Sequence, residues 1–236
     1  MHADATATVS LPPDMTSFSI EAPYERNRLT SFFRFFTALP HLIFLALYSI
    51  VALFAIIGAW FAIVFTAKYP AGLYGFVERF VRYSSRVNSY LYLATDSFPP
   101  FDGKIEHPYE AVFLLGPPKE RYSRPKTFFR GILVFPYAIA AYVLSTVVQN
   151  IVGLAWLVIL FMGHQPNGVQ KILTISLSFQ IRLSAWMCFL TEAWPTIDDP
   201  LSEGMPELAA TAQPAPTEPP PPPAPPTPPA VPDMPS

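Results

Sequence analysis

Two long stretches of the chain contain no charged residue. Residues 38–67 run for thirty positions without Asp, Glu, Lys or Arg, and residues 131–163 form a second stretch of the same kind. A helix rises about 1.5 Å per residue, so each stretch exceeds the roughly 30 Å of hydrocarbon in a bilayer. A buried helix of a water-soluble protein would show polar positions at helical spacing, and these stretches do not. The pattern predicts two apolar helices that span a membrane or insert deeply into it.

A different pattern follows each apolar stretch. Between residues 73 and 93, aromatic and aliphatic residues recur at spacings of three and four, with charged residues on the opposite face. Residues 169–191 form a further helix-like run. A helix that is basic on one side and aromatic on the other is typical of the membrane interface, where we expect this pair of helices to lie. Glu78 and Arg82 have the i,i+4 spacing of a helical ion pair.

The two halves of the chain are related by an internal repeat. A shift of 96 residues without gaps superposes residues 28–102 on 124–198, with eighteen identities in seventy-five pairs. A shared apolar bias does not align proline, glycine, arginine and tryptophan at one offset. The aligned pairs include Arg34 with Arg130, Pro40 with Pro136, Trp60 with Trp156, Gly72 with Gly168, and Arg86 with Arg182. The chain is therefore interpreted as a duplicated unit.

The patterns together predict a mainly α, integral membrane fold. It consists of two tandem repeats of short strand, transmembrane helix and amphipathic interfacial helix, with strand-like runs at 17–22 and 109–115. The first repeat covers residues 17–102 and the second covers residues 103–198. We expect two disordered ends: a small, polar N-terminus at 1–16 and an acidic, proline-rich tail at 199–236 with polyproline II character.

Composition and charge add an orientation. The chain is 51% hydrophobic and 14% charged, which suits a small membrane protein. All fifteen Lys and Arg residues lie between Arg26 and Arg182, and ten of them lie between the two apolar stretches. By the positive-inside tendency, the central section is predicted to be cytoplasmic and both termini to face outward. The scattered basic residues give no support for nucleic-acid binding.

Two other topologies remain open. Residues 172–190 carry one charge, Arg182, and this run would serve as a third span. Alternatively, each apolar stretch is a hairpin wedge that never crosses, with Gln149 and Asn150 at the apex of the second. Their counterparts in the first repeat are the apolar residues Leu53 and Phe54. We therefore favour a hydrogen bond between helices for these two amides.

Few polar residues are candidates for a site. Asp96 and Glu192 are matched acids after the amphipathic segments, and we expect them to pair with Arg86 and Arg182 and to hold the helix ends. His41 is expected to have a simple interfacial role. The chain has no spacing typical of a metal site, a phosphate loop or a nucleophile–base pair, so we expect no catalytic, metal-binding or cofactor-binding residue. The candidate structural or functional polar positions are Arg86, Asp96, Gln149, Asn150, Arg182 and Glu192.

Several runs in the chain resemble a known family. They are LPH at 39–41, AWFAIVFT at 59–66, KYPAGL at 68–73, RVNSYLYLATD at 86–96 and PPF at 99–101. These runs look like the bacterial domain-of-unknown-function 4389 family, present as two copies over roughly residues 23–200. The second copy departs from the pattern where Tyr137 stands in place of the histidine. The resemblance implies an integral membrane protein of bacteria and supplies no activity.

These observations lead to an expected function. The first hypothesis is a non-enzymatic, multi-pass accessory or scaffold protein of the bacterial inner membrane. Its expected partners are the lipid bilayer and a protein bound through the proline-rich tail, or a second copy of the chain. The alternative is a small transport or channel component that works as an oligomer, with Gln149, Asn150, Arg86 and Arg182 along a path. A lipid-handling enzyme is the third reading, and it lacks a nucleophile–base pair.

Overall fold

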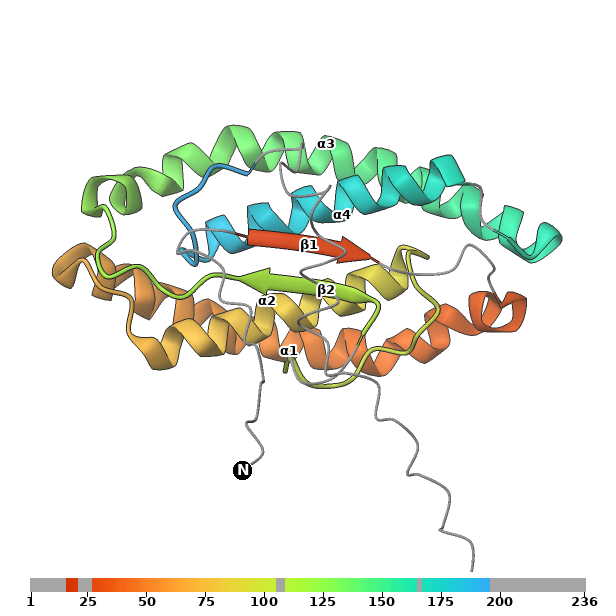
Figure 1. The fold of residues 1–236 in the computed structure, drawn as a ribbon, viewed down its shortest axis with the longest axis horizontal. Helices are drawn as coiled ribbons and strands as arrows, with labels where there is room; N and C mark the ends of the chain where they lie inside the picture. The colour runs from red at the N-terminus through yellow and green to blue at the C-terminus, as the bar shows by residue number, and fades with distance from the viewer. Residues whose placement is uncertain (1–15, 21–26, 105–108, 165–166, 196–236) are drawn as a thin grey trace, which may run out of the picture.

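The chain forms two helical hairpins and a small sheet that packs on their short helices. The computed structural model describes residues 16–20, 27–104, 109–164 and 167–195, so the disorder expected at both ends concerns residues almost wholly outside this part. The first hairpin consists of α1 (Arg28–Thr66) and α2 (Ala71–Leu91), and the second of α3 (Arg124–Met162) and α4 (Asn167–Met187). In Figure 1, α1 and α3 run in opposite directions along the two long edges of the molecule. The described part is mainly helical, as the sequence predicted.

The two long helices begin and end with matched local signals. The Asn27 side chain caps α1 by accepting hydrogen bonds from the backbone N–H groups of Leu29 and Thr30, at 2.9 and 3.3 Å. After α1 the chain turns at Ala67 with φ 58°, and after α3 it turns at Gly163 with φ 78°. Both helices are longer than the apolar stretches, because the aromatic and basic residues before each stretch continue the helix. At 39 residues each, they extend about 58 Å.

The short helices are buried against the long ones. Ten residues of α2 are buried, and they include Val77, Tyr83, Val87 and Tyr90, which belong to the aromatic face assigned to the membrane interface. That face is covered by protein, so the prediction that it contacts lipid is wrong. The predicted ion pair between Glu78 and Arg82 is confirmed.

The prediction for the end of the last helix also needs correction. The chain leaves α4 after Met187 and turns at Phe189, which has φ 61°. The helix therefore stops about one turn before the predicted end at residue 191. The first hairpin behaves in the same way: α2 ends at Leu91, and the chain then turns at Leu93, which has φ 59°.

The sheet links the two halves. The strands β1 (Thr16–Ile20) and β2 (Ala111–Leu115) pair antiparallel, with Phe18 opposite Phe113. Both strands coincide with predicted strand-like runs. β1 precedes the first hairpin in sequence but packs on α4, while β2 precedes the second hairpin and packs on α2. Each half therefore places its strand on the short helix of the other half (Figure 1).

Each hairpin returns to the end of the molecule where it began. The Asn27 N–H, at the start of α1, donates to the Asp96 carboxylate after α2 at 2.8 Å. The Ser123 N–H, at the start of α3, donates to the Glu192 carboxylate after α4 at 2.6 Å. The section between the long helices therefore reaches both ends of the molecule. The prediction of one cytoplasmic central section with both termini opposite it does not fit this geometry.

The long helices leave large apolar side chains exposed. Two described segments, Arg28–Thr66 and Ile139–Met162, are long and apolar enough to cross a membrane, and only 11% and 17% of their most apolar windows are buried. A core helix of a water-soluble protein would be mostly buried. On α1, Phe36 is 74% exposed and Phe54 is 68% exposed. On α3, Tyr142 is 73% exposed and Phe161 is 80% exposed.

One glycine is required by close packing in the first half. A Cβ at Gly103 would overlap the Arg79 carbonyl oxygen and lie 2.8 Å from its carbon. We expect Gly103→Ala to lower the free energy of unfolding by about 1–3 kcal/mol, because backbone must move to admit the methyl group. The matched control is Gly72→Ala, where a Cβ meets nothing within 4 Å. Denaturant unfolding in detergent measures both, and equal stability of the two variants would contradict the packing argument.

Candidate functional site

An arginine and a carboxylate fasten the first hairpin at one end. Arg34 on α1 donates to the backbone carbonyls of Tyr90 and Thr95, the latter at 2.8 Å, and its guanidinium lies 4.5 Å from the centre of the Tyr90 ring. It also forms a salt bridge with Asp96, whose other oxygen accepts from the Asn27 N–H. The long helix thus caps the end of α2, and the acid after α2 caps the start of the long helix. Both charges lie where the helix dipoles favour them.

The second hairpin repeats this arrangement. Arg130 on α3 donates to the Trp186 carbonyl at 2.7 Å and lies 4.8 Å from the centre of the Trp186 ring. Glu192 accepts from the Ser123 N–H and, through its other oxygen, from the Lys119 ammonium at 2.8 Å. We call each arrangement a reciprocal clamp. Its arginines, Arg34 and Arg130, were missing from the predicted site, although the 96-residue repeat aligns them.

The predicted partners of the two acids are therefore wrong. Asp96 was expected to pair with Arg86 and Glu192 with Arg182, but the salt bridges join Asp96 to Arg34 and Glu192 to Lys119. The arginines on the long helices stand beside the ends of the short helices because each hairpin folds back on itself. The expected role of the acids, which is to hold helix ends, does match their contacts.

Arg86 fastens the loop after α2 to the body of that helix. Its guanidinium donates to the backbone carbonyls of Asp102 and Lys104 at 3.3 and 2.8 Å, faces the Asp102 carboxylate, and lies 5.6 Å from the centre of the Tyr109 ring. Arg82 beside it donates to the Gly103 carbonyl at 3.0 Å. Burial and the neighbouring Arg82 lower the pKa of Arg86, while Asp102 raises it in part. Burial also raises the pKa of Tyr109.

The remaining predicted positions do not join this group. Arg182 is buried on α4. The repeat aligns Asp198 with Asp102, which faces Arg86, but Asp198 lies outside the described residues. Asn150 is exposed, and its amide donates to the Thr146 carbonyl of its own helix at 2.7 Å, so the hydrogen bond between helices predicted for it is replaced by a local one. Gln149 is exposed and lines a cavity between the hairpins. The six predicted positions are therefore dispersed rather than gathered in one site.

His41 is enclosed by aromatic side chains. It is fully buried, its Nδ1 lies 2.8 Å from the Tyr83 hydroxyl, and its ring stacks on Phe101 with the centroids 3.9 Å apart. The interfacial role expected for His41 is wrong, because the loop after α2 folds over it. Phe101, which stacks on His41, belongs to the run at 99–101 that carries part of the family resemblance, and the neighbouring Phe98 adds a second ring to the enclosure.

The described residues offer little for catalysis. They contain no group of three or more His, Cys, Asp or Glu residues that could hold a metal ion. Burial raises the pKa of the Cys188 thiol to about 12, which keeps it protonated and weakly nucleophilic at neutral pH. The arginines donate mainly to backbone carbonyls. This arrangement can hold helices and loops in place, and it resembles structural hydrogen bonding more than an acid–base pair.

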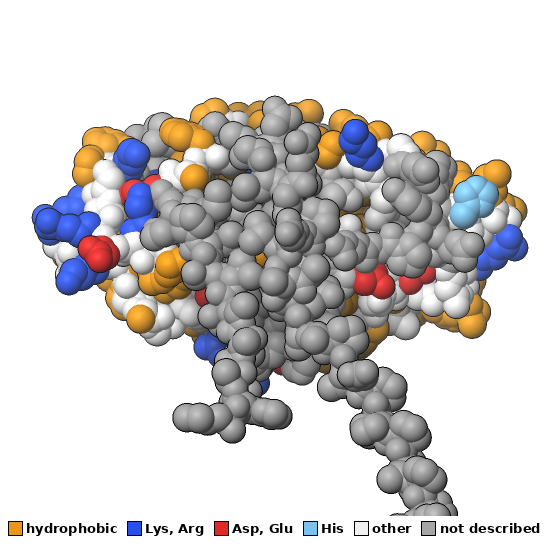
Figure 2. Space-filling view, viewed as in Figure 1, with side chains coloured by type: hydrophobic (Ala, Val, Ile, Leu, Met, Phe, Trp, Pro, Cys, Tyr) orange, Lys and Arg blue, Asp and Glu red, His pale blue; other side chains and the backbone are white. Residues whose placement is uncertain are grey.

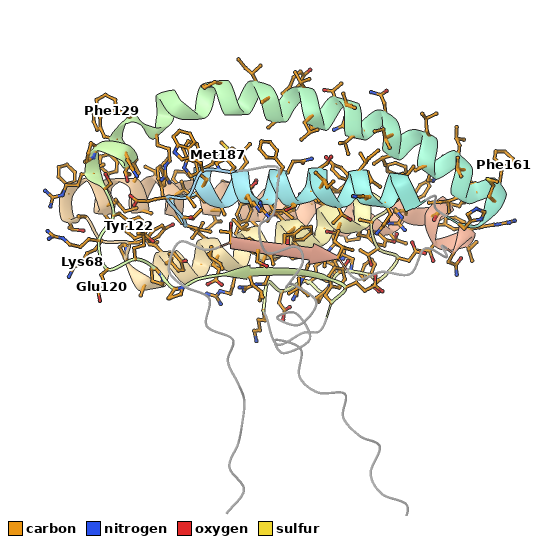
Figure 3. All side chains as sticks on the ribbon, turned by 45° about the horizontal axis from the view of Figure 1, so that its top comes forward. Lys68, Glu120, Tyr122, Phe129, Phe161 and Met187 are labelled. Carbon is orange, nitrogen blue, oxygen red and sulfur yellow. The ribbon has the colours of Figure 1, made fainter. Side chains whose placement is uncertain are left out.

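Basic side chains gather where the two hairpins join. Lys68, Arg121, Arg124 and Lys126 are exposed there, and a cavity of about 620 Å³ lies between Lys68, Lys119 and Arg121. Figure 3 shows Lys68, Glu120 and Tyr122 at this end and Phe161 at the opposite end, and Figure 2 shows the blue basic cluster. We call this group the basic end. Such a cluster beside exposed phenylalanines suits contact with anionic lipid headgroups.

The reciprocal clamp yields a stability prediction. Replacing Asp96 by Asn removes the charge that compensates the buried Arg34, whose side chain is 2% exposed. We expect Asp96→Asn to lower the free energy of unfolding by about 3 kcal/mol, as when one partner of a buried pair is lost. The control is Glu120→Gln at an exposed position, with an expected change within about 0.5 kcal/mol. Denaturant unfolding in detergent compares them, and an unchanged Asp96→Asn midpoint would remove the clamp from the account of stability.

Comparison with known proteins adds a family and no activity. The chain matches the domain of unknown function DUF4389 over residues 28–102 and again over residues 124–197. These limits coincide closely with the repeat, and each match begins at the first residue of a long helix. No curated protein and no solved structure matches the chain. Because the two matches together cover more than half of the sequence, the chain belongs to the DUF4389 family, of which it carries two tandem copies.

Proposed function

We propose that the protein is a non-enzymatic scaffold or accessory protein of the bacterial inner membrane. The observation that carries this proposal is the exposed apolar surface of α1 and α3, which water would solvate poorly and hydrocarbon would accept. The clamps and the buried arginines are engaged in holding the fold together. The lipid bilayer is the first partner, and the proline-rich tail is the means of recruiting a protein.

The geometry favours a particular placement in the membrane. Because each hairpin returns to the end where it began, it either crosses the bilayer twice or lies along it. Two crossings would put the exposed Arg79 and Lys104, about halfway along the molecule, at the depth of the hydrocarbon. The two-stranded sheet would lie at the same depth with open edges, which hydrocarbon tolerates poorly. We therefore propose that α1 and α3 lie along the membrane, with their apolar sides inserted and the sheet facing water.

The basic end supports a cytoplasmic location for this face. Arg82 and Arg86 are buried, so they contribute little to orientation, whereas Lys68 and Arg121 are exposed beside the 620 Å³ cavity. Each Lys or Arg near an anionic leaflet contributes about 1 kcal/mol of attraction. The sequence predicted a multi-pass protein in which α1 and α3 cross the membrane. The topology experiment below distinguishes that arrangement from helices that lie along the membrane.

The alternative function, a transport or channel component, loses its main support. That reading placed Gln149, Asn150, Arg86 and Arg182 along one path. In the fold, Arg86 binds the loop after α2, and the amide of Asn150 turns to its own helix. These residues do not line a common passage through the described part of the chain.

The placement is tested by labelling single cysteines. In a Cys188→Ser background, Lys68→Cys and His164→Cys mark the two ends of the molecule, and Lys104→Cys marks the sheet side. With α1 and α3 lying along the inner leaflet, a membrane-impermeant maleimide should label all three variants in inverted membrane vesicles and none in intact spheroplasts. Labelling of Lys68→Cys and His164→Cys from opposite sides would show crossing helices and contradict the placement.

The scaffold role is tested by removing the tail. Deletion of residues 204–236, which contain fourteen prolines, should abolish copurification of the partner protein while membrane retention and helix content stay unchanged. The matched control replaces the same residues with a Gly/Ser segment of equal length, which keeps the spacing and removes the polyproline II character. If the full chain and the deletion variant copurify with the same proteins, the tail has no recruiting role.

A further inference from the structure

A cavity lies between the two hairpins, near the first reciprocal clamp. It has a volume of about 400 Å³ and is formed by the start of α1, the end of α2 and the second half of α3. Its walls include Arg34, Phe35, Leu93, Gln149, Gly153 and Trp156. The volume falls in the range of about 300–1,000 Å³ that is usual for small-molecule sites. The mostly apolar walls indicate an apolar occupant.

The repeat shows how the α3 wall of the cavity differs from its counterpart in the first half. The shift of 96 residues aligns Gly153 with Ile57 and Gln149 with Leu53. A Cβ added at Gly153 would meet nothing within 4 Å, so the missing side chain leaves open space rather than accommodating a neighbour. The second half thus has a small residue and a polar residue where the first half has two large apolar ones. Gly153 is not required for the packing of the helices.

A buried donor belongs to a residue in the wall of this space. Arg34 lines the cavity, its side chain is 2% exposed, and its Nε has no hydrogen-bond partner among the described residues. Its other nitrogens are engaged by Asp96 and by two backbone carbonyls. Leaving a buried N–H without an acceptor costs about 1–3 kcal/mol. An occupant whose oxygen reached this N–H would remove the cost, and the exposed amide of Gln149 in the same wall offers a second donor.

The surroundings identify the class of occupant. Phe35 is 62% exposed, and Leu154 beside Gly153 is 65% exposed, so the cavity opens onto the apolar sides of α1 and α3. We propose that it binds an acyl chain whose carboxylate or ester oxygen accepts a hydrogen bond from Arg34. The chain fills the space left at Gly153, and Trp156 and Leu93 pack against it. This inference rests on the proposed membrane location and adds a defined lipid site to it.

Trp156 provides the measurement, because bromine atoms quench tryptophan fluorescence at short range. The full chain in detergent is titrated with 9,10-dibromostearate, with phosphatidylglycerol carrying 9,10-dibromostearoyl chains, and with 9,10-dibromooctadecane, which has no oxygen. We expect saturable quenching by at least one of the two oxygen-bearing probes, which identifies a free fatty acid or a phospholipid as the source. The hydrocarbon should bind at least tenfold more weakly. Trp156→Phe should abolish the saturable part, because the other three tryptophans do not line the cavity.

Three substitutions on α3 distinguish a filled site from a damaged fold. Gly153→Ile introduces the residue of the first repeat and should weaken binding at least tenfold, with Gly153→Ala giving a smaller loss. Leu157→Ile, at a position 46% exposed on the same helix, should bind as the wild type does. Helix content and unfolding midpoint are measured for each variant. If Gly153→Ile does not fold, the smaller loss of binding expected for Gly153→Ala tests the site instead.

The outcomes decide the lipid site independently of the membrane location. Three results would overturn the lipid site. They are quenching that never saturates, binding of 9,10-dibromooctadecane as tight as that of the oxygen-bearing probes, and folded Gly153 variants that bind as tightly as the wild type. Loss of the protein from membrane fractions, with saturable quenching retained in detergent, would instead overturn the proposed membrane location. The two failures are therefore distinguishable.

Discussion

The reciprocal clamps are the interactions on which the hairpins depend. Every helix end leaves backbone groups without partners, and beside an apolar surface water is a poor substitute. In the first hairpin, one arginine from α1 satisfies carbonyls at the end of α2, and Asp96 returns a cap to the start of α1. The second hairpin uses Arg130 and Glu192 in the same positions. Each clamp thus fixes the length of the short helix and its alignment with the long one.

Much of the architecture could be predicted from the sequence, because its signals are periodic or local. The apolar runs indicated α1 and α3, the 96-residue shift indicated the duplication, and both strands were recognised from short patterns. The partner of Asp96 could not be predicted in this way. Arg34 and Arg86 are both basic, and both have counterparts in the second repeat. Only the path of the folded chain decides which of them reaches the carboxylate.

The error over α2 has a related cause. A helix with one aromatic face and one basic face has the same pattern whether it lies on lipid or on protein. Here Tyr83 packs inside the molecule, and Arg86 donates to carbonyls of a loop that covers the other side. The cavity at Gly153 was equally hidden from sequence analysis. The repeat reveals the difference between Gly153 and Ile57, but it does not reveal that Arg34, with its buried and unpaired Nε, lies in the wall of the same cavity.

The exchange of strands between the halves bears on how the protein arose. β1 rests on α4 and β2 rests on α2, so neither hairpin completes its own core. An ancestral chain with one copy of the unit would have left its short helix uncovered until a second molecule supplied the strand. Two such molecules, paired about a twofold axis, would reproduce the present fold. Because both copies lie in one chain, positions that the repeat aligns can carry different residues in one molecule, as Ile57 and Gly153 do.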